Sequence, residues 1–413
     1  MTGKIRRFWR LTLLLCPLFP LFGAEITVPV LEMASRGAME EGEFRVASSI
    51  DADIHIGGGP KAGILLGLSL GSADLGRAFA ARNFEFVPMN PGTPVTDAEY
   101  NALGSQVEAQ FNSQALLFFR IVKATAPRVF RLPLELSYFI GVSDYFCFGD
   151  EFASRFNEAP IASDFTGFFY FPEGIGGNPL RRYKGIHGVQ GTGFSLTLTH
   201  WDRIVPMLYL YQDFPWSRDQ GFLSPRSSYS GDLRVLMNME KIKMEGFMGF
   251  TAGKGGGNGI RGGLMAFFRS PMGADLLVQL GIPAWVPGEN TDIDKFYFLM
   301  EPRLGLGPLA LYVTFFYHPV EYIHVKTEDE RGRANVNIKL LGGNIGTSGI
   351  EGGAEATVGL KTNQRNDTTL KLSPLVSFIS GGMRWDLKLR VNVLSWDKPD
   401  EMFEIFAGVR TAY

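Results

Sequence analysis

Apolar and polar residues alternate at every second position through most of the chain. In residues 382–394 the odd-numbered positions from Met383 to Val393 are apolar, and the even-numbered positions between them are polar or charged. Residues 43–56 and 350–361 repeat this pattern. A period of two predicts a β-strand with one apolar face, because an amphipathic helix would repeat its apolar residues every 3.6 positions.

Fourteen further segments carry the alternation, with weaker contrast where both faces are apolar. They are residues 61–70, 114–123, 132–140, 192–200, 204–212, 229–238, 243–252, 259–268, 274–283, 296–306, 309–316, 335–341, 369–378 and 402–413. Most have about ten residues, the length of a tilted strand that crosses a bilayer.

The total of seventeen segments is odd, whereas a bacterial barrel made from one chain has an even number of strands. Either residues 26–32 or the stretch 71–113 supplies one more strand, or one segment is not a strand. We therefore expect an all-β fold, a closed antiparallel transmembrane β-barrel of about 16 strands, within a range of about 14 to 18.

The connections between the segments alternate between long, polar stretches and short turns. The long class comprises residues 143–191, 213–228, 284–295, 317–334, 362–368 and 395–402, and the short class 201–203, 239–242, 269–273, 306–308 and 379–381. Long extracellular loops and short periplasmic turns are the rule in outer-membrane barrels.

The first residues read as a targeting segment. Basic residues precede an apolar run at 11–22, and the small residues Gly23 and Ala24 follow it. This pattern predicts a cleaved signal peptide over residues 1–24, and residues 25–413 then form one barrel domain with long loops at about 71–113 and 143–191. After residue 24 no stretch of eighteen apolar residues occurs, which excludes a membrane-spanning helix.

Composition narrows the function classes. The chain is 45% hydrophobic and 20% charged with a net charge of -2, so nucleic acid is not an expected partner. Fifty glycines and thirty-four phenylalanines fit tight turns that join aromatic-rich strands. Aromatic residues near strand ends, Tyr209 and Tyr211 among them, are expected at the two membrane interfaces.

The chain ends on an alternating segment with an aromatic last residue. Tyr413 shares its face with Val409, Ala407 and Ile405. This ending resembles the C-terminal assembly signal of Gram-negative outer-membrane β-barrel proteins. The resemblance implies a location in the cell outer membrane, with the lipid bilayer and the barrel-assembly machinery as partners, and it identifies no particular family within that class.

A ring of about sixteen strands is too wide for side chains to fill, so its inward polar residues are expected to line a watery lumen. These candidates are Arg384, Lys388, Arg390, Arg410, Glu351, Glu355, Asp232, Arg234, Glu301 and Arg303. The four cations of the last two strands would form a basic stripe opposite acidic residues and give ion selectivity. Alternatively, the charges pair off and stiffen the wall.

The loop 143–191 mixes aromatic residues with the basic cluster Arg181, Arg182 and Lys184. We expect it to fold inward as a constriction or to cap the outer mouth, and an exposed adhesive surface is the competing interpretation. No motif indicates an enzyme, a cofactor or a metal site. Ser195 and His200, for example, lie on opposite faces of one strand and cannot act as nucleophile and base.

The sequence thus predicts an outer-membrane channel that passes small solutes by diffusion or facilitated transport through a charge-lined lumen. Two alternatives stay open. One is a barrel similar to the fatty-acid transporters for hydrophobic ligands, which would need an apolar pocket and a lateral gap. The other is a surface-exposed adhesin displayed on a barrel. An oligomer is compatible with the sequence but not required by it.

Overall fold

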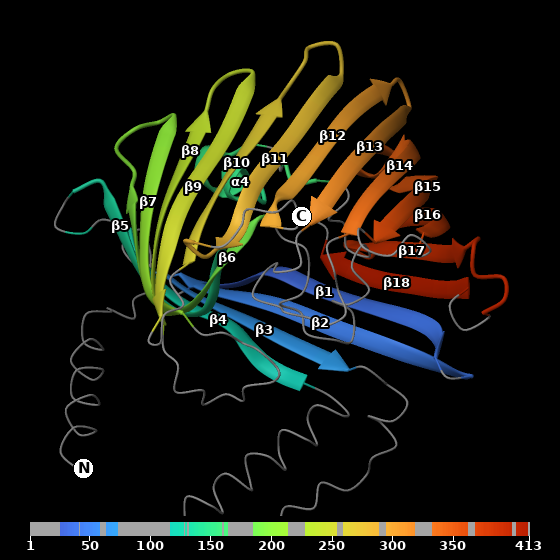
Figure 1. The fold of residues 1–413 in the computed structure, drawn as a ribbon, viewed down its shortest axis with the longest axis horizontal. Helices are drawn as coiled ribbons and strands as arrows, with labels where there is room; N and C mark the ends of the chain where they lie inside the picture. The colour runs from blue at the N-terminus through green and yellow to red at the C-terminus, as the bar shows by residue number, and fades with distance from the viewer. Residues whose placement is uncertain are drawn as a thin grey trace, which may run out of the picture.

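The described part of the chain forms one antiparallel sheet of eighteen strands that closes on itself (Figure 1). A computed structural model describes residues 25–40, 42–57, 63–72, 116–127, 129, 132–158, 161–163, 185–213, 228–253, 259–288, 295–318, 333–361, 368–398 and 402–411. The predicted signal peptide, residues 1–24, lies outside these ranges.

The strands follow one another around the ring in chain order, and β18 pairs with β1 to close it. Their bounds are β1 Glu25–Glu40, β2 Glu43–Gly57, β3 Gly63–Ser72, β4 Leu116–Ala126, β5 Leu134–Phe146, β6 His187–Leu198, β7 Ile204–Asp213, β8 Ser228–Asn238, β9 Ile242–Gly253, β10 Gly259–Phe268, β11 Ala274–Trp285, β12 Tyr297–Leu306, β13 Leu309–His318, β14 Arg333–Asn344, β15 Ile350–Lys361, β16 Thr368–Ser380, β17 Met383–Asn392 and β18 Phe403–Thr411. The described residues also include two short helices, α4 (Glu151–Phe156) after β5 and α5 (Ile345–Ser348) after β14. In the described part, no helix has both the length and the apolar character that a membrane span requires.

All seventeen predicted segments are strands, and β1 is the eighteenth. The strand number is therefore at the upper end of the expected range. β1 contains the candidate residues 26–32, where the alternation is interrupted by a bulge between Thr27 and Val30. A bulge moves the following side chains to the other face, which weakens the sequence pattern of this strand.

Successive strands are antiparallel, so the predicted long and short connections join strand ends at opposite ends of the barrel. β3 ends and β4 begins at the same end as the other predicted long connections, and the short connection between β1 and β2 also lies at this end. At the other end, the two residues Gly381 and Gly382 join β16 to β17 with φ values of 62° and 74°. Two successive positive φ angles define the tight hairpin turn that suits the twist of paired strands, and glycine adopts them without strain.

The expected loop boundaries shift by a few residues. β5 continues to Phe146 and β6 begins at His187, so the expected loop 143–191 is shorter at both ends. Similarly, β3 includes residues 71 and 72 of the stretch expected as loop 71–113. The remainder of that stretch lies outside the described residues.

The two faces of the sheet differ in chemistry. On β17, Trp385, Leu387 and Leu389 are exposed on the outer face, whereas Asp386 and Lys388 are buried on the inner face. The same division holds around the ring, because large apolar side chains are exposed on the outer face of strand after strand. Since the closed ladder satisfies the backbone hydrogen bonds and the outer face is apolar, the barrel suits a lipid environment.

One ladder is shorter than both of its strands. The pairs between β4 and β5 run only from Ala126↔Leu136 to Ile121↔Gly141. Beyond Gly141, whose φ is 105°, the described residues of β4 pair with β3 and those of β5 pair with β6, and no pair joins β4 to β5. The two strands run apart from their paired ends (Figure 1).

Candidate functional site

The chain enters the barrel directly after β5. We call residues 147–158 and 161–163 the inner segment, since they contact side chains on the inner face of the wall. Cys147 and Gly149 have positive φ angles of 58° and 99°, which turn the chain inward into α4. Asn157, with φ of 53°, ends the helix in the left-handed conformation that favours asparagine and glycine.

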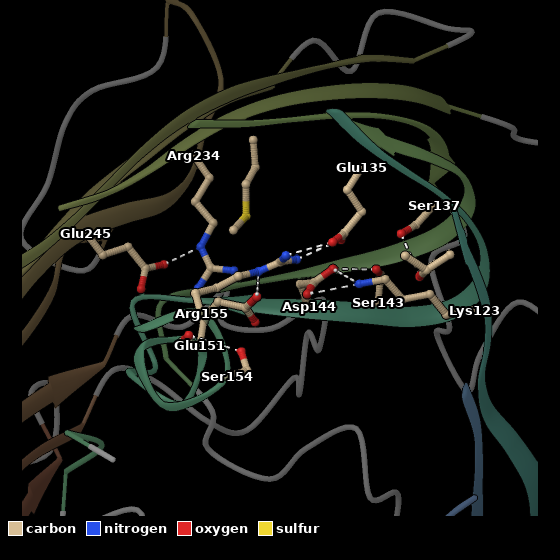
Figure 2. A network of polar contacts seen from close by, with 12 residues as sticks. Lys123, Glu135, Ser137, Ser143, Asp144, Glu151, Ser154, Arg155, Arg234 and Glu245 are labelled. Atoms are coloured by element: carbon tan, nitrogen blue, oxygen red, sulfur yellow. Dashed lines mark hydrogen bonds and ion pairs between the residues drawn. The ribbon is translucent and has the colours of Figure 1, made fainter. Parts of the chain in front are cut away.

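An arginine of α4 fastens the inner segment to β5. Arg155 donates from its two terminal nitrogens to the two carboxylate oxygens of Glu135, each at 2.8 Å, and its Nε donates to Glu151 at 2.8 Å (Figure 2). Burial opposes the charge of Arg155, but the hydrogen bonds to these carboxylates outweigh it and raise the pKa of the guanidinium. A paired fork of this kind fixes orientation as well as charge.

A second fastening lies on β8, β9 and β11. The Cys147 backbone nitrogen donates to Glu245 Oε1 at 2.5 Å, and the Cys147 carbonyl accepts from Gln279 Nε2 at 2.7 Å. Arg234 donates to the same Glu245 at 2.7 Å (Figure 2). The Arg234 guanidinium also lies over the Phe146 ring. Burial and the nearby Glu245 carboxylate raise the pKa of the Cys147 thiol, which therefore stays neutral.

A third fastening lies on β12 and β9. Arg303 donates to the carbonyls of Ile161 and Ala162 at 3.3 and 2.8 Å, and Ser163 donates to Glu301. Glu158 pairs with Lys243 of β9 at 3.0 Å, and the hydrogen bond from this lysine lowers the pKa of Glu158.

Apolar packing accompanies these polar contacts. Phe152 and Ile161 of the inner segment, with Ile186 just before β6, are completely buried. They belong to one cluster with inner-face residues of the wall, namely Ile121, Phe139, Phe146, Val189, Val205, Met207, Tyr209, Tyr211, Leu236, Phe247, Met265, Phe267, Leu277, Tyr297, Leu299 and Phe316. A hydrophobic core therefore lies inside the barrel, against β4 to β13.

The inward position of Tyr209 and Tyr211 contradicts the sequence prediction for these two residues. We expected them at the membrane interfaces, but both are buried inside the barrel. On β7 both faces are apolar, so alternation could not distinguish the lipid face from the core face.

Asp232 belongs to a closed polar network on β6 to β10. Arg261 donates to both carboxylate oxygens of Asp232, at 2.6 and 3.0 Å, and Tyr211 donates to it at 2.8 Å. His187 Nε2 lies 3.6 Å from the same carboxylate. Because every one of these groups is buried, the network links β6, β7, β8 and β10 across the inner face.

The four cations of the predicted basic stripe all lie on the inner face, and each has a carboxylate partner in the same wall. Lys388 pairs with Glu355, and Arg390 pairs with Glu404 at 3.1 Å. Asp386 lies between Arg384 at 2.9 Å and Arg410 at 3.5 Å, and Glu351 lies 3.5 Å from Arg384. This arrangement is the one expected by the alternative interpretation, in which charges pair and stiffen the wall.

The structure thus places all ten predicted lumen residues on the inner face, but in two environments. Asp232, Arg234, Glu301 and Arg303 are on β8 and β12, beside the apolar core, and the other six are on β15, β17 and β18. Ile405, Ala407 and Val409 lie on the outer face of β18, as their alternation predicts. Arg181, Arg182, Lys184 and Tyr413 lie outside the described residues.

Among the described residues, no three His, Cys, Asp or Glu side chains form a group that could hold a metal ion. Arg155 and Glu245, which hold the inner segment, were not singled out from the sequence. A signal existed only for Glu245, which alternates with the apolar residues Met244 and Gly246 on β9.

Comparisons with known proteins identify the fold. No protein-family model matches the chain, and no curated protein matches its sequence. Among solved structures, OccK10 (OpdN) of Pseudomonas aeruginosa is similar with a TM-score of 0.51 and 9% identity, covering 95% of this chain and 99% of that one. OccAB3 of Acinetobacter baumannii has a TM-score of 0.50 and 10% identity over 94% and 98% of the two chains. The chain therefore has the fold of an outer-membrane β-barrel of the porin type.

Proposed function

We propose that the protein is a channel of the cell outer membrane that lets small water-soluble molecules cross by diffusion or facilitated transport. One observation carries the proposal: the closed sheet presents apolar side chains outward and charged side chains inward, as on β17. An apolar outer face suits lipid, and inward charges that keep contact with water suit a polar passage.

Three of the charges that keep such contact are arginines on the last strands and the first. The side chains of Arg36, Arg384 and Arg410 retain 22%, 25% and 32% of their exposed area although they point into the barrel. A guanidinium in a dry interior would cost several kcal/mol. Partial exposure on the inner face therefore supports water inside the barrel. The inner segment is the narrowing element of the proposal.

The location and the partners belong to the same proposal. The predicted signal peptide would direct export, and Tyr413 with the outer face of β18 would be recognised by the barrel-assembly machinery. The proposal includes no catalytic step, because Ser195 is buried on the inner face of β6 while His200 is exposed in the turn that follows.

Conductance of the refolded protein in a planar lipid bilayer tests the proposal. We expect discrete steps of ionic current that are absent when heat-denatured protein is added. Uptake of small neutral sugars of increasing size into liposomes gives the size limit for solutes. A well-folded barrel that yields no current and no uptake of polar solutes would contradict the proposal.

A second function is favoured by the short ladder between β4 and β5. A transporter of hydrophobic ligands needs a lateral gap and an apolar interior. The ladder ends beside Val122 and Ile140, which are exposed on the outer face, and beside Ile121 and Phe139, which belong to the inner apolar cluster. Absence of ionic current in the planar bilayer, together with uptake of a fluorescent long-chain fatty acid into liposomes, would support this function. Silence together with binding to host-cell surfaces would support the adhesin.

A further inference from the structure

The inner face of the barrel divides into two halves of different chemistry. We call the inner faces of β4 to β13 the packed half, and those of β14 to β18, β1 and β2 the charged half; β3 lies between them, with Leu65 partly buried against the apolar cluster. The division is already visible in the sequence, since β7 and β13 are apolar on both faces, whereas β2, β15 and β17 alternate strongly.

The packed half is filled by protein. Its inner-face residues Leu236, Leu277 and Leu299 have no exposed area, and they share one cluster with Phe152 and Ile161 of the inner segment. Two of its ions are equally covered, since the side chains of Arg234 and Glu245 are 1% and 0% exposed, whereas Arg303 of β12 is 17% exposed. Close packing with complete burial leaves no passage for a hydrated solute there.

The charged half has a different wall. Its inner face combines charged side chains with small ones, including Ala34, Ala38, Gly353, Gly359 and Gly408. Among the described residues its only apolar cluster is Ala34 with Phe406 and the partly buried Ala47. Small side chains leave space at the wall, and the side chains of Arg384 and Arg410 keep 25% and 32% of their exposed area there.

We propose that the route through the barrel is eccentric and runs along the charged half, where Arg384 and Arg410 are the charges that a passing solute meets. The inference rests on the proposed channel function and deepens it. In this arrangement the inner segment fills one side of the barrel interior, so the route passes along the other side and is not narrowed evenly from all sides.

The geometry of these two arginines fits a role in selectivity. They share Asp386, which Arg384 contacts at 2.9 Å and Arg410 at 3.5 Å. Arg384 also lies 3.5 Å from Glu351. Arg410 is the more exposed of the two, at 32% against 25%. Its field therefore extends into the route and favours anions over cations.

Cysteine modification during conductance recording tests the position of the route. The variant R410C places a thiol in the charged half, and T197C places one on the inner face of β6 in the packed half, where Thr197 is 3% exposed. A bulky methanethiosulfonate reagent should reduce the current of R410C by at least half and leave T197C unchanged. The unmodified protein, with Cys147 buried, is the control for native thiols.

The outcomes separate this inference from the function on which it depends. If no variant conducts, the channel proposal fails. If the channels conduct but T197C is blocked and R410C is not, the function stands and the eccentric route is wrong. Equal block of both variants also overturns it, because a central pore would be reached from both halves.

Ion selectivity gives an independent readout. The double variant R384Q/R410Q should lower the anion-to-cation permeability ratio at least twofold, measured from reversal potentials in a salt gradient. R203Q removes a charge from the exposed turn between β6 and β7 and should leave the ratio unchanged. An unchanged ratio in the double variant, with normal conductance, would overturn the assignment of the two arginines.

Discussion

The Arg155 guanidinium on α4 and the Glu135 carboxylate on β5 form two parallel hydrogen bonds of 2.8 Å inside the barrel. This pair joins the inner segment to β5, the strand that precedes it in the chain. Together with the contacts of Cys147 and Arg303, it converts a long loop into a fixed part of the interior.

Replacing Arg155 by glutamine should lower the free energy of unfolding by about 1–3 kcal/mol. The variant leaves the Glu135 carboxylate, which is 14% exposed, without its main partner, and the cost is less than for a fully buried pair. Unfolding of the refolded barrel by guanidinium chloride in detergent micelles measures this change in the free energy of unfolding. R203Q, in an exposed turn, should be neutral. Additive effects of R155Q and E135Q in a double-mutant cycle would show that the pair is not coupled.

Acid should weaken the contact between Glu158 and Lys243. The hydrogen bond from Lys243 lowers the pKa of Glu158 from its ordinary value of 4.5 in the folded state. A group with a lowered folded pKa stabilises the protein above the unfolded pKa, and that contribution is lost as the pH falls through the folded value. The difference in unfolding midpoint between the protein and E158Q should therefore be present at pH 7, decrease as the pH falls below 4.5, and disappear once the pH is below the lowered folded pKa of Glu158. A difference that does not change with pH would exclude this ion pair as its cause.

The thiol of Cys147 should be inert in the folded barrel. Burial and the Glu245 carboxylate raise its pKa, so the reactive thiolate is scarce at pH 8, and no solvent reaches the sulfur. Alkylation by iodoacetamide should be on the order of a hundredfold slower in micelles than in guanidinium. The rate in guanidinium is the internal control. Fast alkylation of the folded protein would mean that the inner segment leaves the wall.

Gly185 should tolerate no side chain. Its φ is 82°, and an added Cβ would lie 2.3 Å from the Phe146 carbonyl oxygen. Gly288 has a similar φ of 96° but no atom within 4 Å of the added carbon, so G288A is a matched control for backbone strain. We expect G185A to cost about 2 kcal/mol more than G288A in the same unfolding titration. Equal costs would show that the close approach to Phe146 is not rigid.

Replacing Tyr413 by alanine should impair assembly without impairing the barrel itself. If the terminal aromatic is recognised by the assembly machinery, Y413A should reach the outer membrane in smaller amounts. The same variant should refold normally into detergent, as judged by its heat-dependent mobility on gels. F403A, on the outer face at the other end of β18, is a control for loss of an apolar contact. Failure of Y413A to refold in detergent would indicate a structural role instead.

The strands could be predicted because their signal is local. A side chain on β17 alternates between lipid and interior with its immediate neighbours, so the pattern from Met383 to Asn392 is enough to define the strand. β1 was only a candidate, because its bulge between Thr27 and Val30 shifts the pattern within the strand. The turn between β16 and β17 could likewise be predicted, because it contains the glycine pair at 381–382.

The inner segment could not be predicted for the opposite reason. Cys147 and Glu245 are 98 positions apart, and no periodicity links a loop residue to a strand on the far side of a barrel. The sequence shows that both faces of β7 are apolar, but it does not show what covers the inner face. An apolar inner face reads the same whether it lines a pocket or packs against protein, and only the position of Phe152 and Ile161 decides between them.

The seam between β1 and β18 joins the first described strand to the last, with Ala34 opposite Gly408 and Arg36 opposite Phe406. The polypeptide therefore cannot become a complete cylinder until its final residues have been synthesised. Before that moment the two edge strands carry unpaired backbone N–H and C=O groups, which are costly in the hydrocarbon of a membrane. Membrane insertion and closure of the barrel must consequently occur together. A chain truncated before β18 should be degraded and should not persist as a smaller barrel.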